Sequence, residues 1–354
     1  MKSLFKKISA VLMVAVLMFC AIPFTASANS GYCGDNVTYS FDSSTGVLTI
    51  SGTGPMYDWD PNDNPFRNSD IDVYAKEIII NYGVTAIGEC AFSCLSNVTD
   101  VYIPNSVTEI RMGAFSECWS LININIPDSV ISIGLASFEC CESLESITIP
   151  NSVTYVAESA FDECISLKSV TISNNLTEIS DYMFAGCTAF ETFDIATTVT
   201  KIGTGAFSGC QNLTSLGTTA PNRIHIGDGV VSIGEAAFNG CILIETIRLP
   251  FVGNTATAID NKAVFGYIFG VSSYTGGTAC DQKYGADWDD HKVYYVPSSL
   301  KTVYIGNAPK LGYGAFYNCT TIETLRINYV DEGNIGTDAF KNCVEPVYVS
   351  KGEI

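Results

Sequence analysis

The block ITIPNSVTYVAESAFDECISLKS, residues 147–169, decides the fold of this chain. It recurs along most of the sequence in the approximate form V-T-x-I-G-x-x-A-F-x-x-C-x-x-L-x-x-V-x-I-P-x-S. The phenylalanine of the block returns every 23 residues, at Phe92, Phe115, Phe138, Phe161, Phe184 and Phe207. Phe238 follows after 31 residues, and Phe316 and Phe340 are 24 residues apart. Self-similarity at a short fixed period predicts a solenoid, in which each coil contacts only its neighbours.

Each coil contains three recognisable segments. Leu144, Ile147 and Ile149 predict a short strand that points these side chains inward, and Val153 and Val156 predict a second extended stretch. Ala160, Phe161 and Cys164 then fit one face of a short helix. The pattern therefore predicts an α/β solenoid, a superhelix of ~23-residue coils whose period lies in the leucine-rich-repeat range.

The first 28 residues have the features of a secretory signal peptide. Lysines at positions 2, 6 and 7 precede an apolar run over residues 8–19, and Ala26-Ser27-Ala28 gives a small-residue cleavage pattern. A lipoprotein anchored at Cys20 is the alternative, although Phe19 is bulky where a small residue precedes a lipidated cysteine. Because no second apolar run of spanning length follows, we expect a secreted or cell-surface protein without an integral membrane segment after signal removal.

The chain is strongly acidic. Its 18 Lys and Arg against 37 Asp and Glu give a formal charge of −19, and loss of the three signal lysines would leave −22. Such a surface repels phosphate backbones and anionic lipid, so nucleic acid is not an expected partner. The same charge also keeps a repetitive exported protein in solution.

The cysteines follow the repeat. There are 14, and eight occupy one column, three residues after the phenylalanine: Cys118, Cys141, Cys164, Cys187, Cys210, Cys241, Cys319 and Cys343. Leu95 fills this column in the first repeat, which indicates an apolar core position and a ladder of buried thiols. Stacked disulfides are the alternative for an exported protein. Cys33 and Cys90, outside the column, could form a bridge to the N-terminal segment.

The remaining sequence suggests five segments. After the signal peptide (1–28), residues 29–72 are predicted to be an N-terminal β-rich cap, because residues 37–50 alternate as a β-hairpin around a Ser-Ser-Thr-Gly turn. Leucine-rich repeats are predicted over 73–250 and again over 293–354. Residues 251–292 are an insertion or degenerate repeat with a protruding loop, and eight further residues are inserted between Leu213 and Val230.

The repeat resembles the BspA-like, Treponema pallidum-type leucine-rich repeat. The resemblance rests on blocks such as Ile149-Pro150-Asn151-Ser152-Val153-Thr154 and Ser159-Ala160-Phe161-Asp162-Glu163-Cys164, and it covers about 73–250 and 293–349. It implies a secreted or surface-exposed bacterial protein. Some members of the family are adhesins that bind host matrix proteins or other microbes. The family supplies no catalytic residues to transfer to this chain.

The residues offer little support for catalysis, metals or cofactors. The two histidines, His225 and His291, lie far apart in the interruptions, and a hydrolytic triad or zinc site needs a cluster. Asp58 opens an acidic stretch over residues 58–64, but position six is Asp63 rather than Gly and position twelve is Ser69 rather than Glu, so a polar turn is favoured over a calcium loop. We therefore expect no enzyme, no cofactor and no metal.

The outward positions of the strands are the candidate binding surface. In the middle of the chain they are Ser and Thr, which suit exposed strands. Towards the ends they include Tyr102, Arg248, Tyr304 and Arg326, and Tyr and Arg are the residue types that interfaces favour. These four residues are predicted to form a face that binds an extracellular protein, of the host matrix or of a bacterial surface, with help from residues 251–291.

Two other functions remain open at this stage. The repeats could serve only as a structural spacer or scaffold, with a generic solvated sheet face. Alternatively, a glycan-binding or hydrolytic site could lie in the 251–291 insertion, beside Asp289 and His291. The oligomeric state does not follow from the sequence.

Overall fold

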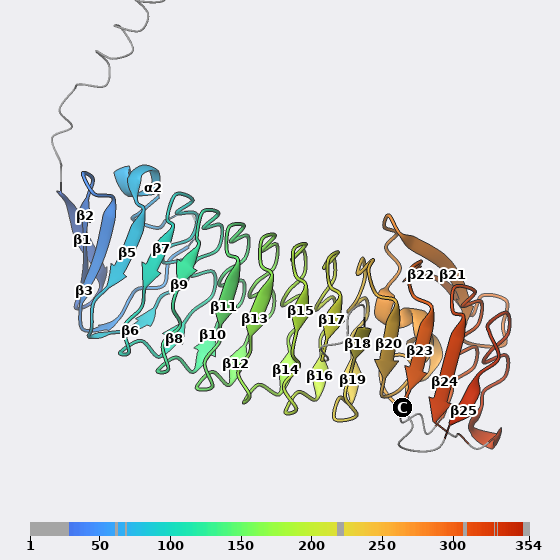
Figure 1. Cartoon of the computed structure of the whole chain (residues 1–354). Coiled ribbons are helices and arrows are strands. Elements are labelled where there is room, and N and C mark those ends of the chain that lie inside the picture. The colour runs from blue at the N-terminus through green and yellow to red at the C-terminus, as the bar shows by residue number, and fades with distance from the viewer. Residues whose placement is uncertain are drawn as a thin grey trace, which may run out of the picture.

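The computed structural model describes residues 28–60, 63–67, 69–217, 223–306, 310–328, 330 and 332–349. The predicted signal peptide, apart from its last residue, lies outside these residues. The chain winds into a solenoid whose strands lie side by side along one axis, from the blue N-terminal end to the red C-terminal end (Figure 1). Long parallel sheets make up the fold, and helices contribute little to it.

One row of strands forms what we call the long face. It begins in a six-stranded sheet of order β1-β2-β3-β5-β7-β9 and continues in a nine-stranded sheet of order β11-β13-β15-β17-β18-β20-β23-β24-β25. From β5 onward the strands of the long face are β5 (Glu77–Ile80), β7 (Asp100–Tyr102), β9 (Asn123–Ile124), β11 (Ser146–Thr148), β13 (Ser169–Thr171), β15 (Thr192–Phe193), β17 (Ser215–Leu216), β18 (Arg223–His225), β20 (Thr246–Leu249), β23 (Thr302–Ile305), β24 (Thr324–Asn328) and β25 (Val347–Val349).

A second row of shorter parallel strands forms another side of the coils. It consists of β4 (Gly54–Pro55), β6 (Val84–Ile87), β8 (Glu109–Ile110), β10 (Ser132–Ile133), β12 (Tyr155–Val156), β14 (Glu178–Ile179), β16 (Lys201–Ile202) and β19 (Ser232–Ile233). Both rows keep the repeat register, as Ser146 pairs with Ser169 in the first and Ser132 with Tyr155 in the second. Successive side chains of a strand point to opposite faces, and Ile147 and Val156 point into the core.

The third side is built from turns, so the predicted helix at Ala160, Phe161 and Cys164 is wrong. Two residues of each turn adopt left-handed backbone angles, here Ser159 (φ 54°) and Glu163 (φ 56°). An α-helix cannot contain such residues. The described residues include one α-helix, α2 (Asp70–Tyr74), and three 3₁₀ helices, η1 (Asp260–Lys262), η2 (Phe265–Phe269) and η3 (Glu332–Asn334).

These turns bond to one another along the solenoid. The N–H of Phe161 donates to the carbonyl of Met183 in the next coil, and the N–H of Phe184 donates to that of Ala206. Residues with left-handed backbone angles flank the phenylalanine of each turn. Because of them, every second N–H group of the turn points to the neighbouring coil and not along a helix axis. The turns therefore satisfy their backbone groups between coils, as the strands do.

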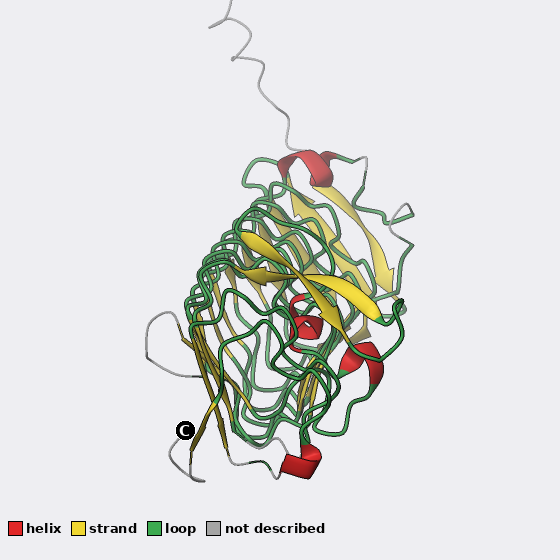
Figure 2. Ribbon diagram, turned by 90° about the vertical axis from the view of Figure 1, so that its right-hand side faces the viewer, coloured by secondary structure: helices red, strands yellow, loops and turns green. Residues whose placement is uncertain are grey.

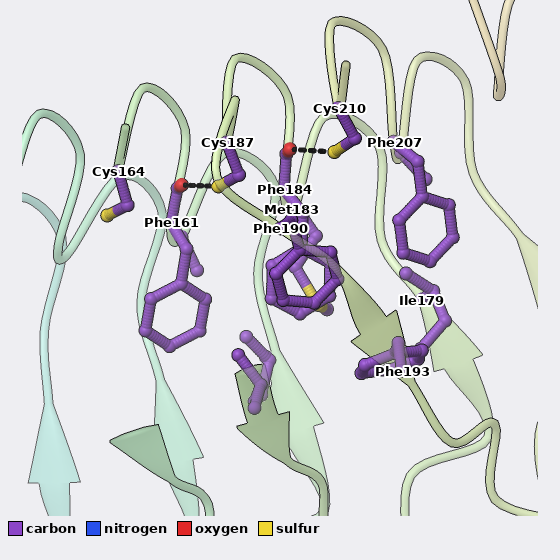
Figure 3. Packing of buried hydrophobic residues seen from close by; sticks show 14 of the residues in the cluster. Phe161, Cys164, Ile179, Met183, Phe184, Cys187, Phe190, Phe193, Phe207 and Cys210 are labelled. Carbon is purple, nitrogen blue, oxygen red and sulfur yellow. Dashed lines mark hydrogen bonds between the residues drawn. The ribbon is translucent and has the colours of Figure 1, made fainter. Parts of the chain in front are cut away.

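A ladder of phenylalanines fills the core. From Phe66 to Phe238 successive rings stack with centroids 5.3 to 5.8 Å apart and interplanar angles of 21° or less. Figure 3 shows part of this ladder around Phe184, where Phe190 and Phe193 add two further buried rings. Phe66 lies in the segment that the sequence analysis separated from the repeats, so the ladder begins one coil earlier than predicted.

The cysteine column runs beside the rings as free thiols, and these are buried as predicted except at Cys343, which is partly exposed. Each Sγ from Cys118 to Cys241 donates to the carbonyl of the phenylalanine 26 or 34 positions before it, at 3.1 to 3.3 Å. Figure 3 shows two of these bonds, Cys187 to Phe161 and Cys210 to Phe184. Burial raises the pKa of these thiols well above the usual value. Cys33 and Cys90 are also free, so the bridge considered between them is absent.

At the N-terminal end, three antiparallel strands precede the first parallel one. They are β1 (Ala28–Gly34), β2 (Val37–Asp42) and β3 (Val47–Gly52), with Tyr39 opposite Ile50. β3 pairs in parallel with β5, so these strands extend the long face (Figure 1). The alternation of Val37 and Phe41 places both side chains in the core.

The two interruptions differ in structure. The eight-residue insertion contributes β18, an extra strand of the long face between β17 and β20. Residues 251–292 replace one turn by η2, whose Ile268 carbonyl accepts from the N–H of Phe238. They also supply most of an antiparallel hairpin, β21 (Gly277–Lys283) and β22 (His291–Pro297), which crosses the coils in Figure 2.

Candidate functional site on the long face

The outward side chains of the long face form two rows that change in charge along the solenoid. One row runs from Glu77 and Asp100 through Asn123 and a series of Ser and Thr to Arg223. This row is acidic at its N-terminal end, has the basic Arg223 beyond the Ser and Thr, and continues with Thr246, Thr302 and Thr324. Because adjacent strands are about 4.8 Å apart, the opposite charges lie several strands from each other.

Three of the four predicted site residues lie side by side. Arg248 of β20, Tyr304 of β23 and Arg326 of β24 are direct neighbours in register. His225 of β18 is the next residue in the same row, opposite Arg248. The guanidinium carbon of Arg326 lies 5.9 Å from the centroid of the Tyr304 ring, which is a cation–π distance.

The sequence analysis missed Arg223 as a member of this group. Its guanidinium carbon lies 5.4 Å from the centroid of the Tyr304 ring, although β20 separates β18 from β23. Arg223 lies in the eight-residue insertion, which the repeat pattern did not assign to a strand. The alternation of Arg223, Ile224 and His225, with Ile224 fully buried, is the strand signal that could have located it.

Arg248 does not face solvent, and its prediction as an exposed position is wrong. Its side chain is 9% exposed, and its Nη2 donates to Asp228 Oδ1 at 3.0 Å. Nη1 donates to the carbonyl of Ile226 at 3.1 Å. Arg248 thus stabilises the coil beneath the face, with its charge balanced by Asp228.

The surroundings of His225, which include two arginines, lower its pKa. Burial lowers the pKa of His225, and the nearby Arg248 and Arg223 lower it further, against an opposing effect of Asp228. A neutral imidazole is therefore expected at physiological pH. The positive field comes from the arginines, not from the histidine.

Tyr102 lies apart from the other three predicted residues. It belongs to β7, and six strands separate it from β20 in the row of Figure 1. The ring is 55% exposed and borders a depression of about 540 Å³ that Asn123 and Ser146 also line. The structure therefore divides the predicted residues into an isolated tyrosine and a C-terminal cluster.

Two further depressions continue along the same face. One of about 690 Å³ is lined by Thr171 and Asp194, among others. Another, of about 330 Å³, is lined by His225 and Asp228 and adjoins the arginine cluster. All three are shallow hollows between the outward rows and the loops that follow the strands.

The acidic stretch at residues 58–64 has a structural role where it is described. Asp58 pairs with Arg111 at 2.9 Å and accepts from the N–H of Glu89. Burial alone would raise the pKa of Asp58, but these contacts outweigh it and lower the pKa. Residues 61 and 62 lie outside the described part of the chain, and no cluster of three potential metal ligands occurs among the residues the structure describes.

The hairpin of the insertion contains one histidine–carboxylate contact. His291 Nδ1 lies 2.7 Å from Asp281 Oδ1, and both side chains are partly exposed. Asp289, considered for a hydrolytic site, accepts through its backbone carbonyl from the N–H of His291. Within the described ranges, no helix has the length and apolar character that a membrane span requires.

The similarity to one known structure supports the fold. A leucine-rich repeat protein from Bacteroides ovatus is similar over 89% of this chain and 81% of its own length, with 23% identity and a TM-score of 0.54. A leucine-rich repeat protein of T. pallidum is 24% identical over 49% of this chain and 86% of its own, with a TM-score of 0.41. A leucine-rich cell surface protein from Faecalibacterium prausnitzii is 19% identical over 89% of this chain and 98% of its own, with a TM-score of 0.34.

The curated proteins contain no match to this chain. A family model does match, and it describes the BspA type leucine-rich repeat region. It matches in six copies over residues 63–188, 132–250 and 217–346, which together span most of the sequence and include Phe66. The chain therefore belongs to the BspA-type leucine-rich repeat family.

Proposed function

We propose that this protein is an exported, non-catalytic binding protein, an adhesin that holds an extracellular protein of the host or of another bacterium on its long face. The observation that carries the proposal is the clustering of Arg223, Tyr304 and Arg326 on neighbouring strands of one open face. Tyr and Arg are among the residue types enriched at the few positions that dominate the binding energy of protein interfaces. Membership of a repeat family that presents extended surfaces supports it.

The proposal includes the organisation of the chain. Residues 1–28 would direct secretion, and the strands of residues 29–72 would close the N-terminal end of a solenoid of ~23-residue coils. The repeats over 73–250 and 293–354 would carry the binding face. The insertion at 251–292 would position the C-terminal coils, rather than carry a hydrolytic or glycan-binding site. Tyr102 would be a second, separate contact.

The test is a pull-down of host matrix proteins and bacterial surface material with the chain that lacks its predicted signal peptide. A face variant combines Tyr102→Ala, Tyr304→Ala and Arg326→Ala. A matched control combines Trp119→Ala, Tyr182→Ala and Lys168→Ala, whose parent side chains are exposed or partly exposed and do not belong to the outward rows. We expect the parent and the control to capture a ligand that the folded face variant does not. Capture of nothing by the parent would favour a structural spacer.

A further inference from the structure

The arginines of this acidic chain are concentrated at one place on the long face. The chain has only five arginines, and three of them, Arg223, Arg248 and Arg326, lie on β18, β20 and β24. With 37 acidic and 18 basic residues in all, this grouping opposes the net charge of the chain. A local positive patch on an acidic protein can attract an anionic partner that the rest of the surface repels.

The geometry places one tyrosine between two guanidinium groups. In the order β18-β20-β23-β24, Arg223 approaches Tyr304 from one side of β23 and Arg326 approaches it from the other. The two guanidinium carbons lie 5.4 and 5.9 Å from the ring centroid. The ring thus restrains two long side chains, which reduces the entropy that they lose when a ligand binds.

The charge of these two arginines is available to a ligand. Arg248 is balanced by Asp228 beneath the face, and the nearby Glu323 is paired with Lys301 at 3.2 Å. Arg326 is exposed and Arg223 is partly exposed. A guanidinium group that packs on an aromatic ring keeps its N–H edge free for a carboxylate, which it can bind with two parallel hydrogen bonds.

We infer that the cluster of Arg223, Tyr304 and Arg326 binds carboxylate groups of an extended acidic segment of a partner protein. The inference rests on the proposed binding role of the long face and names the chemistry of the partner. A sugar ring would need an open face of Tyr304, and the two guanidinium groups occupy the positions beside it. An extended segment fits the face, because Thr246, Thr302 and Thr324 form a polar row in register beside the cluster.

The experiment measures the fluorescence anisotropy of a short labelled peptide of alternating Glu and Thr, titrated with the chain that lacks its signal peptide. We expect binding that weakens as salt increases, and no binding of the matched peptide of Gln and Thr. Arg223→Gln combined with Arg326→Gln should weaken binding at least about tenfold. Arg111→Gln, which removes an arginine paired with Asp58 elsewhere, should leave it within about twofold.

Other outcomes would overturn the inference. Equal losses in the double variant and in Arg111→Gln would indicate non-specific attraction, and tight binding of heparin without binding of the Glu peptide would indicate a sulfated glycan. A dimer in sedimentation that the double variant dissociates would identify the occupant as a second copy of this chain. If the pull-down depends on the long face while the Glu peptide does not bind, the proposed function survives and this inference fails.

Discussion

In the regular coils and in the interrupted coils, different residues make the core contacts between neighbouring coils. Between Phe115 and Phe238 every turn supplies a stacked ring, a buried thiol and N–H groups that bond to the next coil. After residue 250, η2 replaces the turn, and its Phe265 meets Phe316 at 5.1 Å with a tilt of 31°. The comparison shows that the solenoid needs the contacts between coils and does not need the repeat sequence itself.

The thiol column shows what the interruption changes. In the regular part Cys187 Sγ donates to the carbonyl of Phe161. In the interrupted part Cys319 Sγ accepts from Gln282 Nε2 at 3.3 Å and lies 3.8 Å from Cys280 Sγ. Both Gln282 and Cys280 come from β21, so the hairpin supplies the core contacts that a regular coil would make.

The largest expected effect is a difference in the loss of stability between a variant in the middle of the phenylalanine ladder and a variant at its end. Phe161 is fully buried between Phe138 and Phe184, whereas Phe340 is partly exposed and stacks on Phe316 alone. Phe161→Ala should lower the free energy of unfolding by about 4 kcal/mol, because it leaves a cavity between two coils. Phe340→Ala should cost less than half as much. Urea denaturation of both variants measures this, and equal losses would mean that the ladder is not the main source of stability.

The second prediction concerns the substitute core of the interruption. Gln282 is fully buried, and its Oε1 accepts from the N–H of Gly266. Gln282→Leu keeps a similar volume but leaves that N–H without its partner, which should cost about 2 kcal/mol. Thermal unfolding measures the loss. Gln211→Leu, at an exposed position of a regular turn, is the control and should change stability little. If Gln282→Leu left the thermal stability unchanged, the hairpin would not complete the core.

The third prediction concerns the equivalent positions of the regular turns that have left-handed backbone angles. Gly186 (φ 67°) and Glu163 (φ 56°) occupy equivalent positions in adjacent coils. Gly186→Ala should destabilise the fold by about 1 kcal/mol, and Glu163→Gly should stabilise it by a smaller amount. Ala185→Gly, at a position without a positive φ, should destabilise. The signs of the three changes in urea denaturation are the check, and a loss on Glu163→Gly would contradict the turn geometry.

The smallest effect is a pH dependence on the turn side. Burial, Glu163 and Glu139 raise the pKa of Asp162 to about 6. Because this pKa exceeds the ordinary value of 3.8, the folded state binds the proton more tightly than the unfolded chain, and stability falls as the pH rises from about 4 to about 6. Asp162→Asn should therefore be more stable than the parent above pH 6, with a difference that shrinks at low pH. A difference that is constant with pH would contradict this cause.

The sequence predicted the repeat, the inward residues and the outward rows, because each follows from a fixed period. It did not predict the turn conformation, since Ala160, Phe161 and Cys164 have a helical spacing. Recurring glycines such as Gly186 and Gly205 in the left-handed columns were the available signal.

The candidate site was predicted only in part. The alternation of residues identified Tyr304 and Arg326 as outward neighbours. The burial of Arg248 depends on Asp228, which comes close only when the coils stack. Arg223 lies on the strand that the insertion itself adds to the sheet, and it reaches Tyr304 across β20. Such contacts between coils of unequal length cannot be predicted from the repeat period of the sequence.

The central claim, that the C-terminal part of the long face binds a partner, is tested most directly by one capture experiment. The parent, the Arg223→Gln and Arg326→Gln double variant, and the Arg111→Gln control are immobilised in equal amounts and exposed to host matrix proteins and bacterial surface material. The account predicts one ligand that the parent and the control retain and the double variant loses. Equal retention by all three proteins would contradict it.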